Sequence, residues 1–115
     1  MINNNENIIS SRDVIDRISE LAELEDPDEA EIYELRQLRK LADHGEESRE
    51  WRRGETLIRD SYFRDYAEDL ARDCGLVDDS AAWPMNCIDW EKAARELKQD
   101  YRGLIFNYVV YWVRG

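Results

Sequence analysis

Hydrophobic side chains recur at every third or fourth position between residues 55 and 74, which is the spacing of one face of an α-helix. The members of this stripe are Leu57, Ile58, Tyr62, Phe63, Tyr66, Ala67, Leu70, Ala71 and Cys74. Gly75 follows at the position where a helix commonly ends in a left-handed cap. We therefore predict one helix of about five turns over residues 55–74, and we expect the rest of the chain to pack on it.

Two narrower apolar stripes precede this segment and predict two amphipathic helices. The first begins after Ser10 or Ser11, either of which can cap a helix. The second has Asp26 as its predicted cap and Pro27 as its first residue, and it ends at His44-Gly45. So short a connection predicts an antiparallel helical hairpin. Residues 1–9 are rich in Asn and are expected to be frayed.

The segments on either side of residues 55–74 lack a clear period. Residues 46–54 form a charged linker with one aromatic side chain, Trp51. Residues 76–88 predict a structured loop, with Trp83, Pro84 and Ile88 packed beneath the core helix. Asp89 then caps a further helix, whose apolar members are Trp90, Ala93, Ala94, Leu97 and Tyr101.

Beyond Gly103, β-branched and aromatic residues predominate. Residues 104–106 and 109–113 predict a β-hairpin with Asn107-Tyr108 as its turn, and a single strand over residues 104–113 remains the alternative. One face of such a hairpin must rest on the helices. The other face, with Tyr108, Val110 and Trp112, is expected to be exposed, and an exposed aromatic strand invites a partner, including a second copy of the chain.

These patterns together predict an α+β fold that is mainly α-helical. It consists of an N-terminal antiparallel helical hairpin, two core helices and a C-terminal β-hairpin. We expect the chain to divide into an acidic helical hairpin with its linker, residues 1–53, and a compact helix–loop–helix–β-hairpin core, residues 54–115.

The charge narrows the classes of function. The chain has 115 residues, with 16 Lys and Arg against 27 Asp and Glu, so its net charge is −11. Residues 1–50 hold 15 acids and 6 bases, whereas residues 51–115 hold 12 acids and 10 bases. Such a field repels nucleic acid and attracts basic surfaces, which argues against direct nucleic-acid binding. The sequence contains neither a membrane span nor a signal peptide, so we expect a cytoplasmic protein.

A search for reactive groups predicts no enzyme, metal or cofactor. His44 is the only histidine and lies beside a helix-ending glycine. Cys74 and Cys87 lack the spacing of a zinc site or a disulfide framework, and we expect them to be buried thiols. No Gly-rich phosphate loop or calcium loop is present. A small basic patch, which we expect to pair with nearby acids, consists of Arg52, Arg53, Arg59 and Arg64.

Three motifs carry a family resemblance over about residues 54–114. They are GETLIRDSYFRDYAEDLARDCG, WPMNCIDWEKAARELKQDY and the final YWVRG. The chain resembles small acidic proteins of bacteriophages and mobile elements, and it is similar to the C-terminal part of ArdA-type antirestriction proteins. Members share GxTLIRxSYFxxYAxELAxDxG and WPxxxIDWxxAAxxLxxDY. The family commonly has Asp-Gly where this chain has Asn107-Tyr108, and its full-length members are longer, with several domains arranged as an elongated DNA mimic.

The resemblance implies a non-enzymatic inhibitor of a host defence complex, either a restriction–modification enzyme or a CRISPR effector, in the cytoplasm of a bacterial host cell. Its partner would be a basic nucleic-acid-binding surface, because carboxylates spaced on a rigid helical rod can copy a row of phosphates. We predict partner-binding residues on the outer faces of the hairpin at Asp16, Glu20, Glu23, Glu29, Glu31, Glu34 and Asp43. A second row on the back of the core helix is predicted at Asp60, Asp65, Glu68, Asp69 and Asp73.

A different class of function also fits the sequence. The helical hairpin and the aromatic C-terminal strand are both surfaces that can join copies of a chain. The alternative prediction is therefore a structural or adaptor protein that oligomerises through these two elements, and a homodimer is open under either hypothesis.

Overall fold

The computed structural model of the chain describes residues 1–75 and 83–114. The fold is mixed α+β with about 57% helix, so the predicted α+β class is confirmed. The strands are β1 (Ile8–Ser10), β2 (Thr56–Arg59), β3 (Tyr101–Phe106) and β4 (Val109–Arg114). The α-helices are α1 (Ser11–Ala22), α2 (Glu29–Gly45), α3 (Trp51–Gly54), α4 (Phe63–Asp73) and α5 (Trp90–Leu97). Short 3₁₀ helices are η1 (Asp60–Tyr62), η2 (Met85–Cys87) and η3 (Lys98–Asp100).

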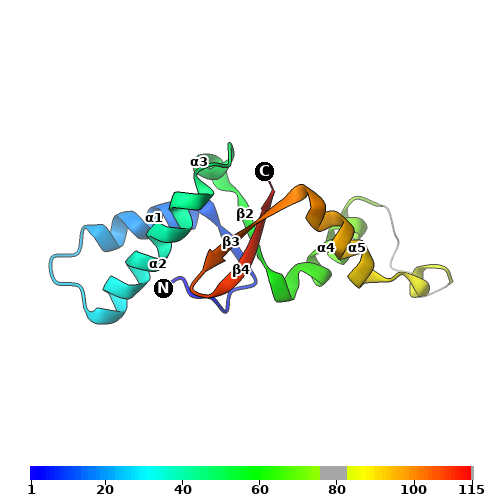
Figure 1. Cartoon of the computed structure of the whole chain (residues 1–115), viewed down its shortest axis with the longest axis horizontal. Coiled ribbons are helices and arrows are strands. Elements are labelled where there is room, and N and C mark those ends of the chain that lie inside the picture. The colour runs from blue at the N-terminus through cyan, green and yellow to red at the C-terminus, as the bar shows by residue number, and fades with distance from the viewer. Residues whose placement is uncertain (76–82, 115) are drawn as a thin grey trace.

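A four-stranded antiparallel sheet lies in the middle of the molecule, with α1 and α2 at one end and α4 and α5 at the other (Figure 1). The strand order is β1-β2-β4-β3. In the register, Ile9 pairs with Leu57, Ile58 with Trp112, and Leu104 with Tyr111. The sheet therefore joins strands from both ends of the chain.

Successive side chains of a strand point to opposite faces, so the sheet separates two hydrophobic clusters. On one face Leu57, Tyr111 and Val113 pack with α1, α2 and Trp51. On the other face Ile58 packs with α4 and α5 around Phe63. The segment 55–74, which has the strongest apolar stripe in the sequence, thus contributes mostly to the smaller cluster. Helices α1 and α2 and the sheet form the larger one.

The predicted helix over residues 55–74 is wrong over residues 55–62. Residues 56–59 form β2, η1 follows, and the α-helix begins only at Phe63. Leu57 and Ile58 are both fully buried, one on each face of the sheet. Two adjacent apolar residues fit a helical stripe and a strand buried on both faces equally well, which explains the error.

The expectation of a frayed N-terminus is also wrong. Residues 8–10 form β1, which pairs with β2, and Ile9 is buried. The backbone N–H of Arg59 donates to the carbonyl of Asn7, and the Tyr111 hydroxyl donates to the carbonyl of Glu6. Strand β1 has only three residues, which is too short for a hydrophobic period to be visible in the sequence.

The charged linker 46–54 contains one of the most buried side chains of the protein. Trp51 begins the single-turn helix α3 and is 1% exposed, so the segment predicted as a charged linker contributes a large side chain to the core. Ser11 ties this turn to α1, because its hydroxyl donates to the carbonyl of Trp51 and accepts from the N–H of Glu55. A single aromatic among charges has no periodic neighbours, and only the tertiary structure buries it.

The helix ends agree with the sequence in part. Ser10 caps α1, Asp89 caps α5 and α2 ends at Gly45, as predicted. The cap of α2 is Asp28 rather than Asp26, because Asp28 and Glu31 form a reciprocal capping box. Helix α5 ends at Leu97 instead of continuing to Tyr101, which is the first residue of β3.

The C-terminal hairpin is confirmed, and the alternative of one continuous strand is wrong. Strands β3 and β4 are joined by Asn107 and Tyr108, which have φ angles of 48° and 69°. Two positive φ angles are those of a type I′ turn, whose twist matches that of the strands. Tyr108 is exposed as expected, whereas Val110 and Trp112 are partly covered.

Four predicted burial sites are wrong. Trp83 is 80% exposed and Pro84 is also exposed, rather than packed beneath a helix, and Cys74 and Cys87 are exposed free thiols. Aromatic and thiol side chains are usually buried, but residue type alone does not place them. Residues 76–82 of the predicted loop lie outside the described residues.

The molecule is a rod. Its principal extents are 59 × 26 × 20 Å, and its radius of gyration is 16.8 Å, compared with about 13 Å for a compact domain of about 100 residues. The elongation follows from placing one helical pair at each end of a small sheet (Figure 1). Among the described residues, no helix has the length and apolar character needed to cross a bilayer.

Candidate partner-binding surface

Negative charge is concentrated at one tip of the rod, where α1 and α2 are joined. Residues 13–34 hold ten acids and one base. The connection between the helices lies at the end of the molecule farthest from α4 and α5 (Figure 1). The exposed acids at this tip are Glu23, Glu25, Asp26, Asp28 and Glu29. We call these five residues the acidic tip.

The acidic tip is supported by the packing of α1 against α2. Helices α1 and α2 are in contact and bury Val14, Leu21, Leu38 and Leu41 in the larger hydrophobic cluster. At the start of α2 the N–H of Glu31 donates to Asp28 Oδ1 at 2.8 Å, and the N–H of Asp28 donates to Glu31 Oε1 at 3.0 Å. Glu31, a predicted binding residue, is therefore also part of the cap of α2.

The other residues predicted on α1 and α2 are mostly exposed. Asp16 pairs with Arg12 at 2.9 Å, and Glu20 pairs with Arg17 at 3.0 Å. Glu23, Glu29 and Asp43 are exposed and have no ion pair within the described part of the chain. Their carboxylates are open to solvent and to a partner.

Glu34 is the exception, and its predicted position on the outer face is wrong. Its side chain is 4% exposed and accepts two hydrogen bonds from the guanidinium of Arg17, at 2.8 and 3.0 Å. It also accepts from the backbone N–H of Ile2 at 3.0 Å. Burial on its own would raise the pKa of Glu34, but these hydrogen bonds and the Arg17 charge hold the pKa below its usual value. Glu34 is thus a structural anchor for the N-terminus.

The second predicted row lies on η1 and α4, across the sheet from α1 and α2. Asp65 and Asp73 are exposed, and Asp69 is exposed and accepts from the Tyr62 hydroxyl at 3.4 Å. Glu68 pairs with Arg72 at 2.7 Å. The two predicted rows are therefore on opposite sides of the sheet and do not form one continuous surface (Figure 1).

Asp60 belongs to this second row but is occupied by structural contacts. Its Oδ1 accepts from Trp112 Nε1 at 2.8 Å and from Lys98 Nζ at 2.9 Å. Lys98 Nζ in turn lies 5.2 Å from the ring centroids of Phe63 and Trp112. The hydrogen bond from Trp112, and then that from Lys98, lowers the pKa of Asp60. The Asp60 carboxylate therefore holds Trp112 and Lys98 against the smaller hydrophobic cluster.

Three members of the acidic tip were not among the predicted residues. Glu25, Asp26 and Asp28 lie in the connection between α1 and α2, whereas the sequence reasoning selected carboxylates on helix faces. The run ELEDPDE over residues 23–29 carried the signal. Exposed bases follow on α2 at Arg36, Arg39 and Lys40, so the acidity is local to the tip.

No group of side chains that could hold a metal ion occurs within residues 1–75 and 83–114. No protein-family model, curated protein or solved structure matches the chain. The candidate surface therefore rests on the geometry and charge of the chain itself.

Proposed function

We propose that the chain is a non-enzymatic inhibitor of a host defence complex, either a restriction–modification enzyme or a CRISPR effector, and that it binds by occupying the complex's DNA-binding surface. The observation that carries this proposal is the acidic tip on a rigid helical pair. In this proposal α1 and α2 act as an antiparallel hairpin that presents carboxylates to a basic groove. The resemblance to ArdA-type proteins points in the same direction.

Charge density supports local rather than full-length mimicry. B-DNA carries one phosphate charge per about 1.7 Å of axis, so about 18 Å of duplex carries about 11 charges. Residues 13–34 include most of the 12-residue helix α1, which spans about 18 Å, and they contribute ten acids against one base. This part of the helical pair therefore offers a charge density of the same order as a short stretch of duplex. Binding there would release cations associated with the carboxylates, as binding of DNA releases the cations condensed on its phosphates.

Phage plating tests the proposal. Hosts that each carry one restriction or CRISPR system are challenged with phage, with and without expression of the chain. The proposal predicts that plating efficiency rises on at least one system and is unchanged on a host without any system. Unchanged plating on every system would contradict it.

Two charge-reversal variants locate the active surface. The tip variant carries Glu23→Lys, Glu25→Lys and Asp26→Lys, and the control variant carries Glu50→Lys, Glu91→Lys and Glu96→Lys. All six residues are exposed, and both variants have a net charge of −5 in place of −11. Mimicry at the tip predicts that the tip variant loses protection while the control keeps it. Equal loss in both variants would indicate that only the overall charge matters.

A second function is favoured by the exposed apolar side chains of the hairpin. Ile105 is 65% exposed and Tyr108 is 92% exposed, and β3 is an edge strand of the sheet. Edge strands with exposed apolar residues pair readily with other strands. The alternative proposal is an adaptor or structural protein that oligomerises through this strand and the helical pair.

Light scattering separates the two proposals. The adaptor proposal predicts oligomers that persist in high salt and dissociate when Ile105→Lys is introduced. A monomer across the accessible concentration range would exclude oligomerisation as the function.

A further inference from the structure

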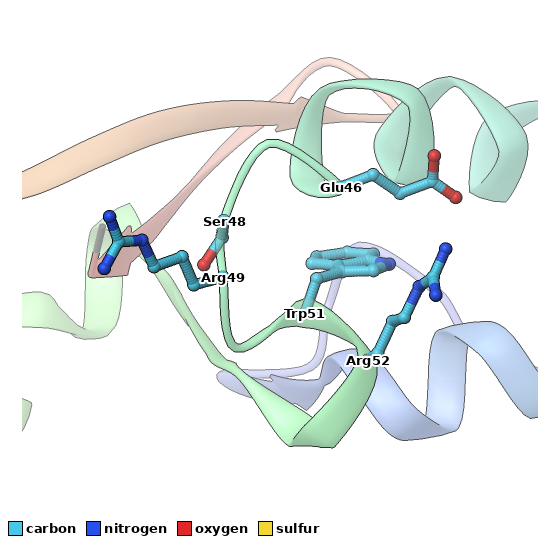
Figure 2. A pocket seen from close by; sticks show the side chains of 5 residues that line it. All are labelled: Glu46, Ser48, Arg49, Trp51 and Arg52. Atoms are coloured by element: carbon cyan, nitrogen blue, oxygen red, sulfur yellow. The ribbon is translucent and has the colours of Figure 1, made fainter.

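A cleft lies at the other end of α2 from the acidic tip, between the C-terminus of α2 and helix α3. It has a volume of about 340 Å³, which is within the range of small-ligand sites. Its lining side chains are Glu46, Ser48, Arg49, Trp51 and Arg52 (Figure 2). None of these residues belongs to the acidic tip, so the proposed function leaves the cleft unexplained.

The floor of the cleft contains an unsatisfied hydrogen-bond donor. Trp51 is 1% exposed, and its indole Nε1–H has no hydrogen-bond partner among the described residues. Leaving a buried polar group unpaired is unfavourable, because the group has lost its hydrogen bonds to water and gained none in the protein. Figure 2 shows the nitrogen end of the ring between the side chains of Glu46 and Arg52, with Arg49 on the opposite side. The donor is therefore directed toward two charged groups.

The charged side chains around the cleft are themselves uncommitted. Glu46, Arg49 and Arg52 are exposed, and none of their side chains forms an ion pair or hydrogen bond within residues 1–75 and 83–114. Ser48 differs, because its hydroxyl donates to Glu55 at 3.0 Å. The cleft thus combines a buried neutral donor, a cationic donor at Arg52 and an anionic acceptor at Glu46.

This combination matches a ligand group that accepts and donates at once. A free carboxylate or phosphate would accept from Trp51 and Arg52, but it would meet the Glu46 carboxylate and a net molecular charge of −11. A carboxamide is neutral, with a carbonyl oxygen that accepts and an N–H that donates. We propose that the cleft binds a carboxamide group of a partner protein, either a peptide bond or an Asn or Gln side chain.

In the bound state the carbonyl oxygen accepts from Trp51 Nε1–H and from Arg52, and the amide N–H donates to Glu46. Nε1 is covered in the free protein, so neighbouring side chains must move to admit the ligand. Pairing Trp51 removes the penalty of its unsatisfied donor, which favours binding. This site is independent of inhibition by the acidic tip, because its ligand is neutral and lies at the far end of α2.

Nuclear magnetic resonance of the indole N–H groups tests the proposal without any knowledge of the partner. The full chain is titrated with acetamide, which stands for Asn and Gln side chains, and with N-methylacetamide, which stands for a peptide bond. Sodium acetate and inorganic phosphate are titrated at equal ionic strength. The expected result is a saturable shift of the Trp51 resonance with at least one amide, while the resonances of Trp83, Trp90 and Trp112 stay in place.

Matched variants assign the shift to the cleft. Glu46→Gln exchanges the proposed acceptor for a neutral side chain and should weaken amide binding several-fold, whereas Glu50→Gln, an exposed neighbour outside the cleft, should leave it unchanged. No saturable shift with either amide, equal shifts of all four indoles, or an effect of Glu46→Gln no larger than that of Glu50→Gln would each overturn the proposal. A saturable response to acetate or phosphate alone would make the cleft an anion site and overturn the carboxamide assignment.

Discussion

Gly45 is the residue on which the packing of Trp51 depends. A Cβ atom at this position would lie 2.3 Å from Trp51 Cζ3 and 2.6 Å from Cε3. We predict that Gly45→Ala lowers the free energy of unfolding by about 1–3 kcal/mol, because overpacking of a filled core forces side chains or backbone to move. Urea denaturation followed by Trp fluorescence measures the change.

Gly103 supplies the control for this substitution. A Cβ there would meet its nearest atoms at 3.5 Å, which is ordinary van der Waals contact. Gly103→Ala should therefore leave the urea midpoint unchanged or raise it slightly. A Gly45→Ala variant as stable as Gly103→Ala would contradict the placement of Trp51 against α2.

The buried carboxylate of Glu34 predicts a pH dependence of stability. Its pKa in the folded protein lies below its usual value, so the unfolded chain binds the proton more tightly. The stabilisation is present above about pH 4.3, the ordinary pKa of Glu, and is lost as the pH falls through the lower folded pKa. Glu34→Gln should cost about 1.5–3 kcal/mol at pH 7 and should flatten the stability profile between about pH 5 and pH 2.

Glu20→Gln is the matched control, because Glu20 also pairs with Arg17 but its side chain is 67% exposed. Exposed pairs contribute about 0–1 kcal/mol, so this variant should keep both the stability and the acid profile. Unfolding titrations from pH 7 to pH 2 on the three proteins decide the matter. Identical profiles for wild type and Glu34→Gln would exclude the structural role.

At the scale of elements, the hairpin turn contains a strained tyrosine. Tyr108 has a φ of 69°, although it is 92% exposed and contributes little packing. A side chain in the left-handed region costs about 1–2 kcal/mol, and glycine relieves this cost. We predict that Tyr108→Gly raises the free energy of unfolding by about 1 kcal/mol, measured by urea denaturation.

The adjacent position should respond in the opposite direction. Asn107 also has a positive φ, but its side chain accepts from the Tyr33 hydroxyl at 2.6 Å. Asn107→Gly removes that hydrogen bond and should cost about 1 kcal/mol. Stabilisation by both substitutions, or by neither, would contradict this account of the turn.

Elements with long local sequence patterns were predicted correctly. Helices α1, α2 and α5 have caps and stripes that extend over several turns, and each was predicted within a few residues. Strands β3 and β4 were found because β-branched and aromatic residues flank a two-residue turn. Local signals of this length are sufficient to identify an element.

Elements that depend on distant partners were missed. Strand β1 is three residues long and exists because β2 offers its edge, and β2 itself was assigned to a helix. The burial of Trp51 depends on a glycine at the end of α2 and on α1. None of these contacts has a sequence period, because the contacting residues are far apart along the chain.

The sequence likewise predicts only part of the candidate surface. The acidity of α1 and α2 is visible in the composition, but Glu34 lies on the inner side of the pair, where Arg17 reaches it. The members of the acidic tip in the connection were overlooked because they follow no helical face. The cleft at Trp51 could not be predicted, since the burial of its donor arises only from the tertiary structure.

At the scale of the whole molecule, the rod places the acidic tip far from α4 and α5. The acidic tip is at one end, and α4 and α5 are at the other (Figure 1). About 59 Å of duplex would carry roughly 35 phosphates, whereas the chain has a net charge of −11 over its 59 Å. Mimicry of an entire duplex is therefore not expected, and contact through the tip is.

Contact through the tip predicts a steep dependence on salt. Exposed charges are screened over about 8 Å at physiological ionic strength, so the affinity for the partner should fall linearly on a logarithmic plot against salt concentration. Association through the apolar side chains of the hairpin would change little over the same range. Titrations between low and high salt distinguish the two modes for any partner that is identified.

The most direct test is the dissociation constant between the chain and a defence complex that the plating assay identifies, measured for wild type, the tip variant and the control variant at one salt concentration. Each reversal at the tip replaces an attraction of up to about 1 kcal/mol with a repulsion of similar size, so the tip variant should bind at least about tenfold more weakly. The control variant, with the same net charge, should bind like wild type. Equal affinities of the two variants would contradict the account, because the position of the carboxylates would then be irrelevant.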